Sequence, residues 1–268
     1  MKNWSGVFAL LAGCAGTSAA TDSDTVSDLA FNDLVANLDL APSGMVHVAA
    51  GVFGMGCNES VDNTCNADEK PFHMVTLRAF DIDRLLVTQS DIAACISAGA
   101  CAAPIKDFDP SNKALLPAND VSFADAVAYC AWRNKRLPSE AEWEKAARGV
   151  DGRKFPWGNS PEPDCDHANF NSCGMALLPV GGRPLGASPY GVLDMAGQVW
   201  EWTADYYDSA YYAVSPSADP TGPATGTLRS KRGGSAWIGP DRVHTSSRWF
   251  HNPTAPDIDI GFRCALSS

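Results

Sequence analysis

The order of apolar and polar positions predicts two strands and then a helix in the first part of the chain. Residues 45–56 are mostly apolar with a glycine break, and residues 71–80 alternate apolar and polar side chains as a half-buried strand does. Thr88 and Ser90 are residue types that start helices, so we expect a helix from there through Ile96.

Two more helices are predicted before residue 150, and short strands after it. The segment 122–132 places four apolar side chains on one helical face: Phe123, Ala126, Val127 and Cys130. Ser139 and Glu142 form a capping box that opens a helix running to about Arg148. Beyond Gly149, glycine and proline become dense, which predicts short strand-like pieces joined by loops.

One stretch, residues 191–205 (GVLDMAGQVWEWTAD), combines acidic and apolar positions in a distinctive way. Asp194, Gly197 and Glu201 alternate with four apolar residues: Leu193, Met195, Val199 and Trp200. Such a run buries one side and gathers carboxylates and carbonyls on the other, and calcium takes oxygen ligands of both kinds. The alternative is an acid-capped turn in the core.

The first residues have the pattern of an export signal. Lys2 precedes a short apolar run, and the sequence LAGC, typical of a bacterial lipobox, ends at Cys14. We therefore expect residues 1–13 to be a lipoprotein signal peptide and Cys14 to carry lipid. Residues 14–44 contain five Asp and no Lys or Arg, which predicts an acidic tether before a domain spanning 45–268. These features predict an extracytoplasmic bacterial lipoprotein that contacts the membrane through its anchor alone, with a secreted protein as the alternative.

Charge and cysteine content narrow the class of protein. A formal net charge of −11 argues against nucleic-acid binding, which needs basic patches. Eight cysteines follow Cys14, and an even number behind an export signal predicts disulfides. Zinc is the alternative, but no C-x-x-C motif is present and the five His are scattered. Six of the cysteines form pairs that are close in sequence: Cys57 with Cys65, Cys95 with Cys101, and Cys165 with Cys173.

Five motifs occur in a specific order along the chain. They are RLPSEAEWEKAARG at 136–149, FPWG at 155–158, the stretch 191–205, RGGS at 232–235 and IGFRC at 260–264. In this order and spacing the chain resembles the formylglycine-generating enzyme, or sulfatase-modifying factor, family over most of its length. The resemblance implies an α+β fold of the C-type-lectin-like kind, with little regular secondary structure. It also implies a disulfide between Cys130 and Cys264.

The resemblance implies a reaction whose metal ligands this chain lacks. The family's enzyme uses oxygen and copper(I) to oxidise a sulfatase cysteine to formylglycine, and two thiolates shortly after RGGS hold the copper. Here residues 236–249 contain no cysteine, and Ile238 and Val243 stand near the thiolate positions. Copper(I) prefers soft thiolate ligands, so we do not expect copper.

The family's calcium ligands do have counterparts. The resemblance places one site at the side chains of Asp194 and Glu201 and the carbonyls of Gly197 and Val199. A second site would begin at Asn169 and Phe170, although its later acidic ligand has no clear match. The segment that lines the family's cleft contains His244, Arg248 and His251, for which the alternative is an ordinary surface or hydrogen-bonded role.

Two functions remain. The first is a membrane-tethered, non-catalytic binding or accessory module for a protein or small-molecule ligand that the sequence does not identify. The second is a formylglycine-generating oxidoreductase, or a related oxidase with an altered metal site. The missing thiolates favour the first.

Overall fold

The computed structural model describes Met1, residues 44–104 and residues 106–268. The predicted signal peptide, Cys14 and the tether up to residue 43 lie outside the described residues. Within the described part, no helix is both long enough and apolar enough to cross a membrane.

Three short α-helices begin at local capping signals. They are α2 (Gln89–Ser97), α3 (Phe123–Trp132) and α4 (Glu140–Arg148). Each N-cap hydroxyl accepts from the backbone three residues later, and the carboxylate there accepts from the N-cap backbone. All three predicted helices are therefore confirmed. Five single-turn 3₁₀ helices lie between them and the strands: Ala67–Glu69, Asn171–Cys173, Pro184–Gly186, Tyr211–Ala213 and Pro240–Arg242.

The strands form three small sheets. The first has the order β1-β4-β9, the second pairs β2 with β3, and the third has the order β7-β6-β5-β8. All neighbours are antiparallel except β5 and β8, which run parallel. The strands are β1 (Met45–Val48), β2 (Gly51–Met55), β3 (His73–Leu77), β4 (Phe80–Asp83), β5 (Trp200–Tyr206), β6 (Arg229–Arg232), β7 (Arg248–His251), β8 (Ile260–Gly261) and β9 (Ala265–Ser267).

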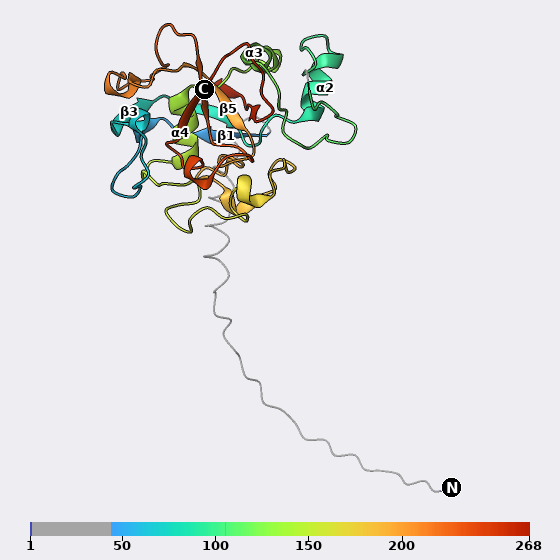
Figure 1. Ribbon diagram of the computed structural model, residues 1–268, viewed down its shortest axis with the longest axis horizontal. Helices are drawn as coiled ribbons and strands as arrows, with labels where there is room; N and C mark the ends of the chain where they lie inside the picture. The colour runs from blue at the N-terminus through green and yellow to red at the C-terminus, as the bar shows by residue number, and fades with distance from the viewer. Residues whose placement is uncertain (2–43, 105) are drawn as a thin grey trace, which may run out of the picture. The chain divides into compact units, whose positions relative to one another are not determined.

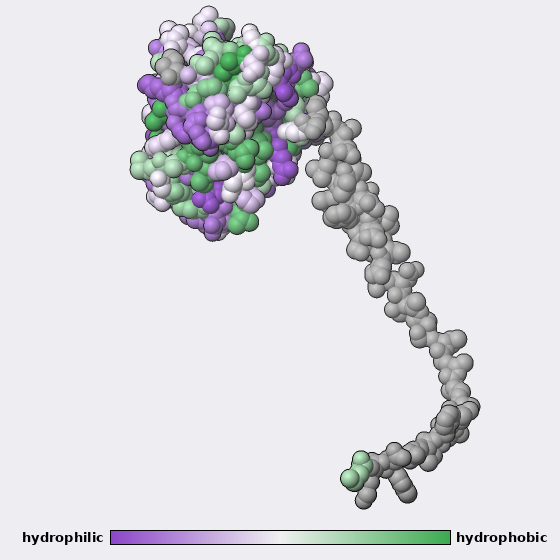
Figure 2. Space-filling model, turned by 90° about the vertical axis from the view of Figure 1, so that its right-hand side faces the viewer, coloured by the Kyte–Doolittle hydropathy of each residue, from purple (hydrophilic) through white to green (hydrophobic). Residues whose placement is uncertain are grey.

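Helix α4 lies at the centre of the folded part, whereas α2 lies at its periphery (Figure 1). Trp143 of α4 is fully buried in an apolar cluster with strands β1 to β4. A second cluster joins α3 to Trp200 and Trp202 of β5 and to the C-terminal Phe262. On the surface, hydrophobic and hydrophilic residues are interspersed across the face that Figure 2 shows.

Four disulfides close the fold, as predicted. Three link neighbouring segments: Cys57 with Cys65, Cys95 with Cys101, and Cys165 with Cys173. The fourth joins Cys130 of α3 to Cys264, across a sequence separation of 134 residues. Every cysteine of the described part is therefore oxidised, which removes the thiolates that a zinc site of cysteines needs.

Candidate functional site

The expected first calcium ligand, Asp194, is a buried carboxylate with one unsatisfied oxygen. Its Oδ2 accepts from the Gly181 N–H at 2.6 Å, while Oδ1 has no hydrogen-bond partner in the described part of the chain. Burial raises the pKa of Asp194, because water no longer stabilises its charge. A backbone φ of 60° holds Asp194 in the left-handed region, which non-glycine residues seldom adopt. An unpartnered, inward-facing oxygen fits a cation.

Glu201, the fourth expected ligand, already has a protein partner. Arg263 donates to both of its oxygens, at 2.6 Å from Nε and 2.8 Å from Nη2, and both side chains are fully buried. A carboxylate has about four acceptor positions, so the Arg263 pair leaves capacity for a cation. The residues of the first site are therefore compatible with calcium. Asp194 Oδ1 would gain most from a bound cation, because it has no hydrogen-bond partner among the described residues.

The loop between these two acids is held by a close approach to Asn169. Gly197 has a φ of 84°, and a Cβ there would lie 1.9 Å from the Asn169 carbonyl oxygen, so only glycine fits. Asn169 and Gly197 form an isolated parallel bridge. This contact brings the two predicted calcium segments side by side.

The second expected site also contains a buried oxygen without a partner, because Asn169 Oδ1 has no hydrogen-bond partner in the described part of the chain. The Gln198 side-chain oxygen accepts from Asn169 Nδ2 at 2.8 Å and from the Leu178 N–H at 3.1 Å. The Phe170 carbonyl accepts from the Cys173 N–H at 2.8 Å, and the Phe170 ring lies in an apolar cluster. Gln198 thus crosslinks this loop by hydrogen bonds. At neither site do the described residues bring together three or more His, Cys, Asp or Glu side chains that could hold a metal ion.

The two positions near the family's thiolates carry aliphatic side chains in different apolar clusters. Val243 is fully buried against Ala168, Phe170 and Ala196. Ile238 is half-buried and packs against the cluster that contains Trp200. Neither side chain can bind a metal, and copper(I) therefore does not fit the residues present here.

A lysine and an aspartate lie close to this segment. Lys231 Nζ is 3.6 Å from Asp259 Oδ1 and 5.2 Å from the centre of the Trp200 ring. Ser235 is the last residue of the RGGS motif, and its hydroxyl donates a hydrogen bond to Asp259 Oδ2 at 3.3 Å. Burial lowers the pKa of Lys231 and raises the pKa of Asp259. These are hard oxygen and nitrogen donors, unlike a pair of thiolates.

Two of the three expected cleft residues point into the protein. His244 Nε2 lies 3.1 Å from both oxygens of Glu69, and both residues are buried. Arg248 forms buried hydrogen bonds with Glu140 of α4. The expectation that His244 and Arg248 line an open cleft therefore does not match their burial. His251, by contrast, is half-buried on β7, with its ring 6.0 Å from that of Trp202.

Sequence reasoning missed the acidic partners of these side chains. Glu140 and Glu144 are one helical turn apart on the buried face of α4, and Arg232 of β6 bridges them at 3.1 and 2.5 Å. Both acids lie on a helix that also buries Trp143. Two buried carboxylates of like charge indicate that cationic side chains from other segments of the chain pair with them. The sequence does not say which cations.

The fold is α+β with few helices and small sheets, and its site combines an acidic loop at 194–201 with a thiolate-free segment after RGGS. Residues 31–268 match the model of the sulfatase-modifying factor enzyme 1-like domain. The chain therefore belongs to the formylglycine-generating enzyme, or sulfatase-modifying factor, family, whose fold is C-type-lectin-like. The match begins upstream of residue 45, where we place the start of the domain.

Relatives of different activity match this chain. The formylglycine-generating enzyme of Streptomyces coelicolor is 33% identical over 283 residues, covering 83% of this chain and 88% of the relative. The inactive C-alpha-formylglycine-generating enzyme 2 of Mus musculus is 36% identical over 177 residues, covering 59% of this chain and 51% of the relative. Among solved structures, PvdO from Pseudomonas aeruginosa is similar with a TM-score of 0.72 and 28% identity, covering 84% of this chain and 94% of PvdO.

Proposed function

We propose that this protein is a non-catalytic binding or accessory module built on the formylglycine-generating enzyme fold. The observation that carries the proposal is Val243, a fully buried aliphatic residue near one of the two positions where the family's enzyme holds copper. Ile238, near the other, is aliphatic as well. The match to a relative whose name describes it as inactive is consistent with a family that also has non-catalytic members.

No other cysteine in the described part can replace the missing pair. All eight are in disulfides, and a sulfur in a disulfide is not a thiolate. A metal held instead by Lys231, Ser235 and Asp259 would have hard ligands, which copper(I) disfavours.

A second candidate is an oxidase with an altered metal site. The 33% identity with the Streptomyces coelicolor enzyme over most of both chains supports it. Such an oxidase would have to bind its metal through oxygen and nitrogen ligands, and Asp241, His251 and Asp259 are residues in or shortly after this segment that are not fully buried.

The affinity for copper(I) distinguishes both candidate functions from that of the family's enzyme, because neither candidate has the two thiolates that hold copper(I). The purified full chain is titrated with copper(I) in competition with a chromophoric copper(I) chelator, beside the Streptomyces coelicolor enzyme as a positive control. We expect the chelator to keep the copper in the presence of this chain. Retention of one equivalent of copper(I) by this chain, at an affinity like that of the control, would contradict the proposal.

We further propose that calcium binds at Asp194, Gly197, Val199 and Glu201. The unpartnered Asp194 Oδ1 supports this, because a buried carboxylate oxygen without a partner is costly unless a cation or donor meets it. Calcium here would have a structural role, holding the loop 194–201 to the start of β5. The carboxylate and carbonyl ligands are of the kind that calcium prefers.

We also propose that Cys14 is lipidated, so that the domain lies outside the cytoplasm on an acidic tether. The motive is the LAGC sequence after an apolar run, and four disulfides are typical of an oxidising compartment. Replacement Cys14→Ser is expected to move the protein from membrane to soluble fractions, as immunoblotting of the fractions would show. Unchanged membrane association of the variant would contradict the anchor.

A further inference from the structure

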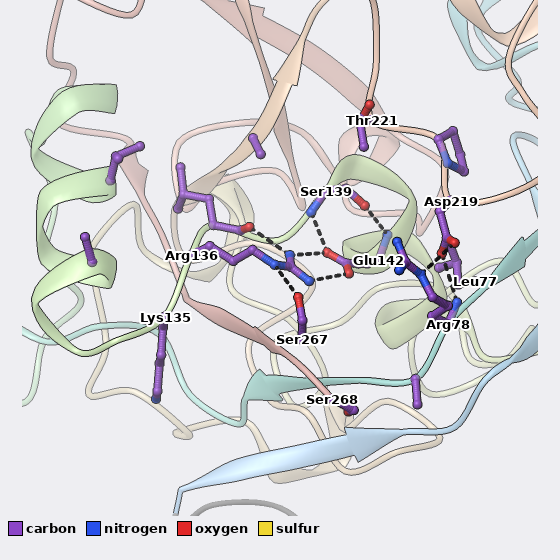
Figure 3. Close-up of a pocket in the computed structure, with 16 residues that line it drawn as sticks. Leu77, Arg78, Lys135, Arg136, Ser139, Glu142, Asp219, Thr221, Ser267 and Ser268 are labelled. Atoms are coloured by element: carbon purple, nitrogen blue, oxygen red, sulfur yellow. Dashed lines mark hydrogen bonds and ion pairs between the residues drawn. The ribbon is translucent and has the colours of Figure 1, made fainter.

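A cavity of about 600 Å³ lies away from both the acidic loop and the thiolate-free segment. It is bordered by the turn from β3 to β4, by α3, by the segment that leads into α4, and by the end of β9 (Figure 3). Ligand pockets for small molecules are commonly of this size.

The cavity has an apolar side. Its lining includes the buried side chains of Leu77 and Leu137, together with Val127 and Ala131 of α3. Val127 is 42% exposed, on a helix whose buried residues are Ala126, Tyr129 and Cys130. An apolar group placed in the cavity would cover Val127 and remove this surface from water.

Most polar groups of the cavity are already satisfied by protein partners. Arg136 forms a two-pronged pair with Glu142, at 2.6 and 2.7 Å, and its Nε donates to Ser267 at 3.1 Å. Lys135 points away from these groups and pairs with Asp83 at 2.5 Å (Figure 3). These charges are neutralised and present few free donors to a ligand.

Arg78 is different because half of its guanidinium remains unused. Asp219 accepts from the Arg78 backbone N–H and from its Nε, each at 2.9 Å. No protein acceptor within the described ranges meets Nη1 or Nη2, and the side chain is 87% exposed. Asp219 thus fixes the Nε edge of the guanidinium and leaves the Nη edge free, which matches a carboxylate with two parallel hydrogen bonds.

We propose that this cavity binds small organic acids in which a single carboxylate is joined to a compact apolar body. The carboxylate meets the Nη edge of Arg78, and the apolar body covers Val127. The site does not depend on the absence of copper, since an active oxidase with these residues would keep the same cavity. Its test therefore measures binding and not oxidation.

Octanoate is a suitable probe, and octanamide is its uncharged counterpart. Each is titrated into the ¹⁵N-labelled full chain, and amide shifts are followed by NMR. We expect saturable shifts at the amides of Arg78, Ala79, Val127 and Ser267, with octanoate binding about fivefold more tightly than octanamide. This ratio corresponds to one charge pair at a largely exposed site.

Three variants assign the contribution of each part. Arg78→Gln is expected to abolish the preference for octanoate, because the free guanidinium edge is lost. Val127→Glu, which puts a charge on the apolar side at an exposed position, is expected to weaken both probes at least tenfold. Arg133→Gln, which removes an exposed arginine next to the cavity but outside its lining, is the control and is expected to change neither.

The following results of the titrations would contradict the proposal. Octanamide binding as tightly as octanoate would remove the carboxylate from the assignment, and an equal effect of Arg133→Gln would indicate nonspecific charge attraction. Absence of saturable shifts up to the solubility limit of octanoate, or shifts confined to other amides, would show that the cavity is not the site.

Discussion

Arg248 donates two hydrogen bonds to the carboxylate of Glu140, at 2.7 and 3.0 Å, and both side chains are buried. Arg232 reaches the same carboxylate at 3.1 Å. One carboxylate of α4 therefore accepts hydrogen bonds from arginines of both β6 and β7. Arg248 also donates to the Asp68 carbonyl at 2.6 Å, so this pair ties α4, the third sheet and the loop before β3 together.

We predict that Glu140→Ala lowers the free energy of unfolding by about 3–5 kcal/mol, because it leaves Arg248 and Arg232 buried with one carboxylate fewer. Chemical denaturation followed by tryptophan fluorescence measures this. The control is Glu59→Ala, which breaks an exposed ion pair with Lys70 and is expected to cost less than about 1 kcal/mol. Equal costs for the two variants would contradict the role of the Glu140 pair.

Stability should also depend on pH through Asp205. Burial, and then the neighbouring charge of Glu140, raise the pKa of Asp205 to about 8 from its usual 3.8. Between pH 3.8 and about 8, the Asp205 carboxyl group therefore keeps its proton in the folded state and has lost it in the unfolded state. The stabilising contribution is complete below pH 3.8 and is lost progressively as pH rises to about 8.

We therefore predict that Asp205→Asn reduces the fall in stability between pH 5 and pH 8, because an amide cannot ionise. Denaturation curves at several pH values, for the variant and the parent, give the two slopes. Asp166→Asn, at an exposed position, is the control and should keep the parent slope. A parent-like slope for Asp205→Asn would show that Asp205 ionises normally.

Local signals in the sequence predicted the helices well. Ser139 and Glu142 satisfy the first turn of α4 from within the same segment, so their capping role needs no knowledge of the rest of the fold. The close cysteine pairs are similar, because the chain between their members is short. Helix caps and short disulfides can be predicted from sequence because the two interacting residues lie only a few positions apart in the chain.

The partners of the buried charges could not be predicted in this way. Glu140 meets Arg232 and Arg248 across 92 and 108 residues, and His244 meets Glu69 across 175. Which cation meets which acid depends on how the sheets pack. For the same reason the family resemblance could assign His244 and Arg248 only to a segment that lines the family's cleft, without showing their buried partners, and the sequence gave no sign of the cavity at Arg78.

The long disulfide should contribute more to stability than a short one. In the chain-entropy model, the Cys130–Cys264 link restrains a loop of 134 residues and contributes about 5 kcal/mol, against about 2 kcal/mol for the six-residue separation of Cys95 and Cys101. We predict that replacing the first pair by alanine lowers the midpoint of denaturation more than replacing the second pair. Equal shifts would show that chain entropy does not govern these links.

Calcium should raise the melting temperature if it binds at Asp194. A ligand that binds only the folded state adds about 2.7 kcal/mol at a hundredfold excess over its Kd. We predict that calcium stabilises the chelator-treated parent, and that Asp194→Ala removes this effect. Asp241→Ala, at an exposed position, should respond like the parent. A melting temperature of the parent that does not change with calcium would contradict the site.

The central claim is that this chain does not form formylglycine, since Ile238 and Val243 offer no thiolates to hold copper(I) beside the substrate sulfur. The most direct measurement incubates the copper-treated full chain with a Cys-x-Pro-x-Arg peptide in air and follows the peptide by mass spectrometry. The Streptomyces coelicolor enzyme is the positive control. We predict an aldehyde product from the control and none from this chain above the level without enzyme. Aldehyde formed by this chain at a rate like the control's would contradict the claim.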